Sequence, residues 1–198
     1  KREYHRNGTL SKAEVMVIMI LFHNSGYRCL KHFYLEHVCR QLRHLFPEVV
    51  SYNRFVELEK DVAVPLALFI KKVLLGKCTG MSFVDSTPLR VCKNQRIHIH
   101  KTFKGIAQRG KCSMGWFFGF KLHLICNEKG ELLNFMITPG DVDDRKPLDH
   151  KAFVEFLYGK LVGDKGYIGK ELFQRLVVDG IQLITKLKSN MKGALMTT

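Results

Sequence analysis

The spacing of apolar residues changes near residue 80, and this change limits the possible folds more than any other feature of the chain. Up to about residue 75, apolar residues recur every three or four positions, which is typical of amphipathic helices. From residue 81 onward, short apolar runs such as MSFV and FFGFKLHLIC are typical of strands. The sequence therefore predicts a helical region, residues 1–78, followed by a mixed α/β domain, residues 79–198.

Start and stop signals divide the helical region into several short helices. A capping box beginning at Ser11 predicts the start of the first helix, and a second helix is expected to end before Pro47. Ser51 is a candidate N-cap for a third helix, which we expect to break near Pro65, and a fourth is expected over 66–75. Short helices with basic faces suit a DNA-binding helix-turn-helix unit, and equally a plain helical bundle.

The elements expected after residue 80 follow one another in the order strand, basic insert, hairpin, helix, strand, helix, strand. The runs FFGFKLHLIC and ELLNFMITPG are joined by NEKG, which is a good hairpin turn. KLVGD reads as a strand, KELFQRLVVDG as a helix stopped by Gly180, and IQLITKL as a final strand. This order predicts a mixed sheet with flanking helices.

The charge of the chain favours a polyanionic partner. Lysine and arginine number 32 against 18 aspartate and glutamate, which gives a net charge of +14. Such an excess favours nucleic acid first and an anionic membrane second, with an ordinary basic protein as the plain alternative. Residues 86–127 contain no acid, and together with Lys165 they supply the candidate DNA-binding residues. These are Arg90, Lys93, Arg96, Lys101, Lys104, Arg109, Lys111, Lys121 and Lys165.

Other global features favour a soluble cytoplasmic protein. The longest apolar run, VMVIMILF, is far shorter than the roughly 20 residues of a membrane span. The six cysteines form no CxxC pair and resemble no disulfide framework, so we expect reduced thiols. The Cys/His cluster in CLKHFYLEHVC, residues 29–39, matches no common zinc-finger spacing.

Two aspartates occupy similar positions. Asp85 follows SFV and Asp164 follows LVG, so each is expected to close a buried strand just before a turn. Strand ends are where ligands and catalytic groups gather in α/β sheets, and adjacent strands would bring the two carboxylates together. Such a pair suits Mg²⁺, with Mn²⁺ as an alternative, because a divalent cation relieves the repulsion between carboxylates. The plain alternative is that each aspartate caps a turn.

For two further groups of residues, the sequence is compatible with two different roles. The acids of GDVDDRKPL, at positions 141, 143 and 144, are expected to cap the following helix, with metal binding as the alternative. Phe103, Trp116 and Phe117 lie within the basic insert and are candidates either for stacking on DNA bases or for packing in the core.

Three segments resemble the DDE transposases of bacterial insertion sequences. They are FVDSTPL, KTFKGIAQRGKCSMGWFFGFKLHLICNEKGELLNFMITPGDVDDRKPL and LVGDKGYIG, which together span about residues 80–190. The resemblance implies an RNase H-like catalytic domain in which Asp85 and Asp164 are two of three acidic metal ligands. It also implies double-stranded DNA at element ends and target as the partner, a homodimer in the active complex, and a bacterial cytoplasmic, nucleoid-associated location.

The third acid of that family has no counterpart in this sequence. In the family it is a glutamate on a later helix, within a motif of tyrosine, arginine and lysine, and no such motif follows IQLITKL. Glu171 lies only seven residues after Asp164, so it is not assigned this role. We therefore expect a transposase truncated before its third acid and inactive in DNA cleavage by itself. The alternatives are a catalytically defective DNA-binding remnant and an RNase H-like nuclease.

Overall fold

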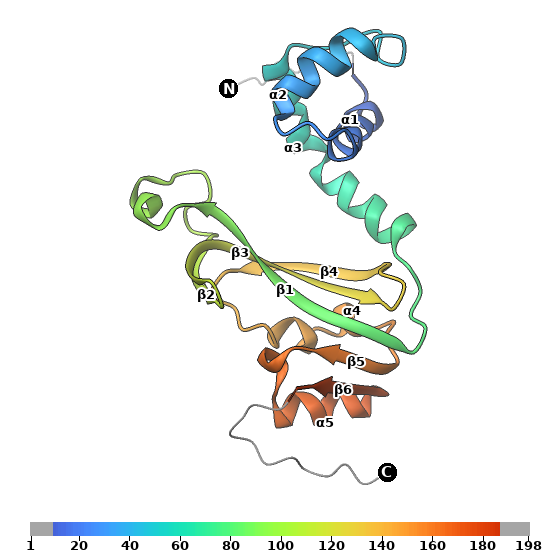
Figure 1. Cartoon of the computed structure of the whole chain (residues 1–198), viewed down its shortest axis with the longest axis vertical. Helices are drawn as coiled ribbons and strands as arrows, with labels where there is room; N and C mark the ends of the chain where they lie inside the picture. Colours follow the sequence, from blue (N-terminus) through green and yellow to red (C-terminus); the bar gives the residue numbers. More distant parts are fainter. Residues whose placement is uncertain (1–9, 187–198) are drawn as a thin grey trace, which may run out of the picture. The chain divides into compact units, whose positions relative to one another are not determined.

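The computed structural model describes residues 10–186, which form two compact units that join between Val73 and Leu74 (Figure 1). The first unit is helical. Its elements are α1 (Lys12–Asn24), α2 (Leu30–His32), the π-helical segment η1 (Phe33–Gln41), α3 (Tyr52–Phe69) and the π-helical turn η2 (Ile70–Leu74), which runs into the join.

Two predicted helix starts in the first unit are confirmed. The Ser11 hydroxyl accepts a hydrogen bond from the Glu14 amide at 3.2 Å, and the Glu14 carboxylate accepts one from the Ser11 amide at 2.7 Å. The Ser51 hydroxyl caps α3 by accepting from the Arg54 amide. These contacts satisfy amides that have no partner inside the first turn of a helix.

The predicted break at Pro65 is wrong, because α3 continues through this residue to Phe69. Proline lacks an amide hydrogen, so it removes one intrahelical hydrogen bond, the one to the carbonyl of Asp61. Asp61 is exposed, and water can therefore satisfy that carbonyl while the neighbouring hydrogen bonds remain. The separate fourth helix expected over 66–75 is accordingly the end of α3 together with η2.

The second unit is built on a curled mixed sheet. Its strands are β1 (Met81–Cys92), β2 (Gln108–Cys112), β3 (Gly115–Asn127), β4 (Leu132–Pro139), β5 (Gly159–Gly163) and β6 (Ile181–Thr185). The order is β2-β3-β1-β5-β6, with β4 also paired to β3. The β1/β3, β2/β3 and β3/β4 pairs are antiparallel, whereas β1/β5 and β5/β6 are parallel. The predicted mixed α/β fold class is confirmed.

Short helical segments connect the strands, and those that follow β4 pack on one face of the sheet. The connecting segments are η3 (Asn94–Ile99), η4 (Lys146–Asp149), α4 (Lys151–Val154), η5 (Lys165–Tyr167) and α5 (Lys170–Val178). Leu172 and Leu176 of α5 and Phe153 of α4 form one buried cluster with Val84 and Leu161 of the sheet. None of the described helices is both long and apolar enough to cross a lipid bilayer.

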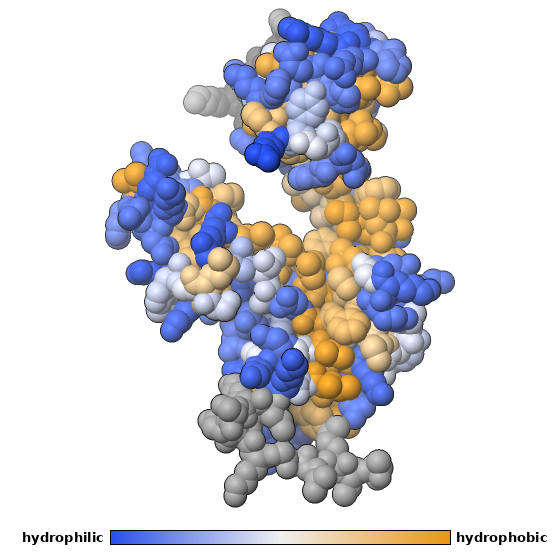
Figure 2. All heavy atoms as spheres, viewed as in Figure 1, coloured by the Kyte–Doolittle hydropathy of each residue, from blue (hydrophilic) through white to orange (hydrophobic). Residues whose placement is uncertain are grey.

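The opposite face of the sheet is open and partly apolar. Met81 and Phe83 of β1 and Ile184 of β6 are 37–42% exposed on this face. Figure 2 shows the corresponding apolar surface over β1, β5 and β6, next to hydrophilic side chains that cover the segment between β1 and β2. Asp85 follows Phe83 by two positions on β1, so strand alternation places it on this open face as well.

Candidate active site

The register of the sheet places Asp85 next to Asp164. The parallel ladder between β1 and β5 ends with the pair Val84 and Gly163, and the two aspartates are the next residue on each strand. Asp164 is still extended, with φ −76° and ψ −179°. Neighbouring strands lie about 5 Å apart, so the sheet brings together two acids that are far apart in the sequence.

The expectation that Asp85 ends its strand is wrong, because β1 continues from Asp85 to Cys92. Beyond Val84, β1 loses its pairing with β5 but keeps its antiparallel pairing with β3. Pro88 is tolerated there because one side of the strand has become an edge that needs no amide donor. Asp85 therefore lies where one ladder ends, which leaves its side chain beside open space although the strand itself goes on.

Each carboxylate has one oxygen bound by a nearby amide. Ser86 N donates to Asp85 Oδ1 at 2.8 Å, and Gly166 N donates to Asp164 Oδ1 at 2.7 Å. The contact of Asp164 is the turn cap that the plain alternative predicted. Both side chains are exposed, and neither is ion-paired with a basic residue within residues 10–186. Two adjacent anions with free oxygens are a fitting donor set for a divalent cation.

A small pocket opens between these carboxylates and the end of the β2/β3 hairpin. It has a volume of about 280 Å³, and its wall includes Asp85, Asp164, Lys111 and Met114. A third acid, Asp144, also lines it. On the other side of the pair lies a broader hollow of about 790 Å³ whose lining includes Phe83. The carboxylate pair thus separates a small polar pocket from a wide, more apolar one.

The acids of GDVDDRKPL separate into two roles. Asp143 receives the Arg145 amide at 2.9 Å and the Arg145 guanidinium at 2.8 Å, and hydrogen bonds from this guanidinium lower the pKa of Asp143 to about 2. Asp143 therefore holds the turn before η4, but no side chain caps η4 or α4, so the predicted helix-capping role is wrong. Asp144 does not cap a helix; it lies in the pocket, where Lys121 Nζ binds its Oδ1 at 2.9 Å. No local pattern distinguishes the two aspartates, because the partner of Asp144 lies on another strand.

The candidate DNA-binding residues fall into two groups. Lys121 is only 8% exposed, and its ammonium donates to the Val142 carbonyl at 2.8 Å as well as to Asp144. The other eight are exposed: Arg90, Lys93, Arg96, Lys101, Lys104, Arg109, Lys111 and Lys165. Most of these exposed cations lie along the end of β1, the connection through η3, and β2.

The three aromatic side chains of the basic insert have different surroundings. Phe103 is 37% exposed, with its ring edge-on to Phe120 at 5.5 Å. Phe117 is 1% exposed and packs in the interior of the sheet domain, whereas Trp116 is 54% exposed. The Arg109 guanidinium and the Lys111 ammonium lie 5.4 and 5.9 Å from the centre of the Trp116 ring. This arrangement joins an exposed stacking surface to two cations.

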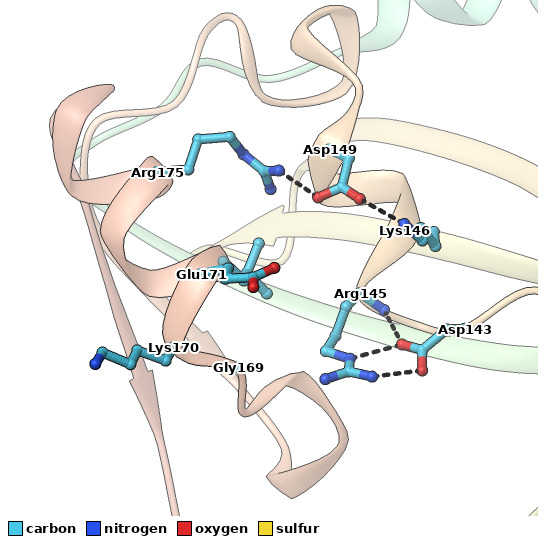
Figure 3. A pocket seen from close by; sticks show the side chains of 9 residues that line it. Asp143, Arg145, Lys146, Asp149, Gly169, Lys170, Glu171 and Arg175 are labelled. Atoms are coloured by element: carbon cyan, nitrogen blue, oxygen red, sulfur yellow. Dashed lines mark hydrogen bonds and ion pairs between the residues drawn. The ribbon is translucent and has the colours of Figure 1, made fainter.

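A second charged hollow, of about 490 Å³, lies between η4 and α5 (Figure 3). Glu171 lines this hollow, and it is absent from the linings of both hollows beside Asp85. The hollow contains ion pairs within the chain itself: Arg145 with Asp143, and Arg175 with Asp149. Because these cations are already neutralised by neighbouring carboxylates, the hollow is a weaker candidate than the acidic pocket.

Comparison with known proteins agrees with this architecture. The model of the transposase DDE domain family matches residues 75–198. Since this is more than half of the chain, the protein belongs to the transposase DDE domain family. The resemblance of the three sequence segments to DDE transposases is thereby confirmed. A comparison with curated protein sequences gives no match.

Among solved structures, the piggyBac transposase has a similar fold. The piggyBac transposase, in a synaptic complex with hairpin DNA, is 13% identical with a TM-score of 0.52, and the match covers 97% of this chain and 46% of that one. The Mos1 transposase in a paired-end complex with the left transposon end is 11% identical with a TM-score of 0.31, covering 92% of this chain and 60% of that one. The chain thus spans about half the length of the piggyBac transposase.

Proposed function

We propose that this protein acts in DNA transposition, through metal-dependent cleavage and transfer of DNA strands at the ends of an insertion sequence. The observation that carries the proposal is the adjacency of Asp85 and Asp164 where the β1/β5 ladder ends. Their carboxylates would hold Mg²⁺ or Mn²⁺. A pair of such cations would stabilise the negative charge that develops in a phosphodiester displacement.

In this proposal, the exposed basic surface binds the DNA partner. The eight exposed cations would contact backbone phosphates of double-stranded DNA, and Lys165 follows Asp164 directly. Trp116, with Arg109 and Lys111 close to its ring, offers a surface on which a base could stack. Lys121 is the exception, because its buried ammonium is bound to Asp144, and in our proposal it orders the pocket.

The proposal includes a homodimer as the active form, a role for residues 1–78 in DNA recognition, and a location with bacterial DNA in the cytoplasm. It also includes the expectation that this chain does not cleave DNA by itself, because two acids are available where the family uses three. A DNA-binding protein without catalysis is the second candidate. It shares every feature of the first candidate except the third acid, so metal-dependent cleavage distinguishes the two.

Substitution of Asp85 by asparagine tests the catalytic part. A longer version of the protein that carries the third acid should nick DNA containing the element ends in Mg²⁺, and Asp85→Asn should abolish nicking while DNA binding is retained. Asp179→Asn, at an exposed acid after α5, is the matched control and should cleave normally. Cleavage by the Asp85 variant at the normal rate would refute the site, whereas strong nicking by the 198-residue chain would refute its expected inactivity.

A further inference from the structure

The ring of Tyr167 lies directly beneath the two candidate metal ligands. Tyr167 is the last residue of η5 and is 1% exposed. A Cβ atom added to Gly163 would lie 3.1 Å from the Tyr167 ring and 3.2 Å from a methyl group of Val84. Val84 and Gly163 are the residues that directly precede Asp85 and Asp164, so the ring packs under the end of the β1/β5 ladder.

The hydroxyl of Tyr167 is buried and makes no hydrogen bond within the described part of the chain. The Ser86 hydroxyl is close enough to lower the pKa of Tyr167 slightly, but the contact does not meet hydrogen-bond geometry. Burial raises the pKa of the Tyr167 hydroxyl, and the negative charges of Asp144, Asp85 and Asp164 raise it further. The group is therefore a neutral phenol close to three carboxylates, able to donate a hydrogen bond that it does not make here.

An unpaired buried hydroxyl destabilises a folded protein, because it has lost water without gaining another partner. Phenylalanine would fill the same space beneath Gly163 without this cost. The hydroxyl is thus poorly explained by packing, and its position points to a partner that is present in another state of the pocket.

Hydrogen bonds also hold the third carboxylate of this pocket, that of Asp144, in place. Lys121 Nζ donates to the Val142 carbonyl at 2.8 Å and to Asp144 Oδ1 at 2.9 Å, which fixes the third carboxylate of the pocket. A carboxylate that binds a cation through one oxygen keeps lone pairs for a donor on its other side. Such outer partners orient the ligands of a metal, and their loss typically weakens metal binding by about 10–100-fold.

We propose that Tyr167 is a positioning residue of the acidic pocket, whose hydroxyl donates a hydrogen bond to one carboxylate of the Asp85 and Asp164 pair when the pair holds a divalent cation. This inference rests on the proposed function, because it requires the two aspartates to bind a cation. It adds a residue that contacts neither the cation nor DNA and acts only through the orientation of the ligands.

The test compares Tyr167→Phe with Tyr34→Phe in the 198-residue chain, with Mn²⁺ as the probe. Tyr34 is the matched control, because it is also fully buried but its hydroxyl donates to the Val50 carbonyl at 2.8 Å. Mn²⁺ affinity is measured by calorimetry, and the melting temperature is measured without metal. We expect Tyr167→Phe to bind Mn²⁺ about 10-fold more weakly or worse, with an unchanged or raised melting temperature. Tyr34→Phe should melt lower and bind Mn²⁺ normally.

The outcomes separate this inference from the proposed function. Normal Mn²⁺ binding by Tyr167→Phe, when Asp85→Asn has lost it, would overturn the role of Tyr167 and leave the metal site intact. A melting temperature of Tyr167→Phe that falls as far as that of Tyr34→Phe would also overturn it, since the hydroxyl would then have a structural partner. Equal binding by the unmodified chain and Asp85→Asn would overturn both proposals.

Discussion

Lys121 and Lys111 lie in the same basic stretch of the sequence, but the side chain of Lys121 is buried and that of Lys111 is exposed. Both lie in the acid-free stretch 86–127, yet Lys121 is buried against Asp144 whereas Lys111 is exposed beside Trp116. Strand alternation explains the difference, because Lys121 shares the buried face of β3 with Phe117 and Ile125. A lysine on that face is stable only when its ammonium finds partners.

Lys121→Ala should therefore destabilise the protein. It leaves the Val142 carbonyl and Asp144 without their shared donor, and we expect a loss of about 1–3 kcal/mol in the free energy of unfolding. Lys111→Ala, at an exposed site, should change it by less than about 0.5 kcal/mol and weaken DNA binding instead. Urea unfolding and a DNA-binding titration measure both effects. Equal stability of the two variants would contradict the structural role of Lys121.

His123 links stability to pH. It is fully buried, its Nε2 lies 2.9 Å from Thr138 Oγ1, and burial lowers its pKa below the usual 6.5. The unfolded chain then binds a proton more readily than the folded chain, so this group costs stability as the pH falls below about 6.5. Melting temperatures between pH 8 and pH 5 should fall more steeply for the unmodified protein than for His123→Gln. Parallel curves would count against a buried neutral imidazole.

At the scale of elements, the end of β5 depends on a small residue. Gly163 does not have a positive φ, so its role is steric: an added Cβ would press on the Tyr167 ring and on Val84. The Tyr167 ring therefore occupies the space that a side chain at position 163 would need.

Gly163→Ala should lower the free energy of unfolding by about 1–3 kcal/mol, the usual range for overpacking a filled interior. It should also weaken Mn²⁺ binding, since the ring that supports the two aspartates is displaced. Lys160→Ala on the same strand replaces an exposed side chain and serves as the control. Thermal unfolding of both variants measures the difference in stability. A Gly163 variant as stable as the control would contradict the prediction, because the Tyr167 ring would then move aside at no cost in free energy.

The whole molecule combines a helical unit with a sheet domain whose exposed cations lie beside its acidic pocket. Coulomb attraction between such a surface and DNA releases counterions, so affinity depends steeply on salt. The proposed binding surface can thus be tested by the slope of affinity against salt concentration.

Removing two cations of this surface, as in the double variant Arg96→Ala and Lys104→Ala, should reduce the steepness of the slope by about 2. Lys129→Ala with Lys151→Ala removes the same charge from exposed positions outside the surface. Fluorescence anisotropy with a DNA duplex at several salt concentrations measures both. Identical slopes would place the DNA elsewhere on the protein.

The sequence alone determined the helix caps at Ser11 and Ser51, the choice of Asp85 and Asp164 as candidates, and the order of elements after residue 80 apart from β2. That strand lies in the segment expected to be a basic insert, and the sequence did not predict it. The predicted features depend on periodicity and on residues a few positions apart, which local patterns report directly. Tertiary structure alone decided that β1 runs past Asp85, that Asp144 joins the pocket, and that Lys121 is buried. Each of these depends on strand register, which pairs residues distant in sequence and is set by packing of the whole sheet.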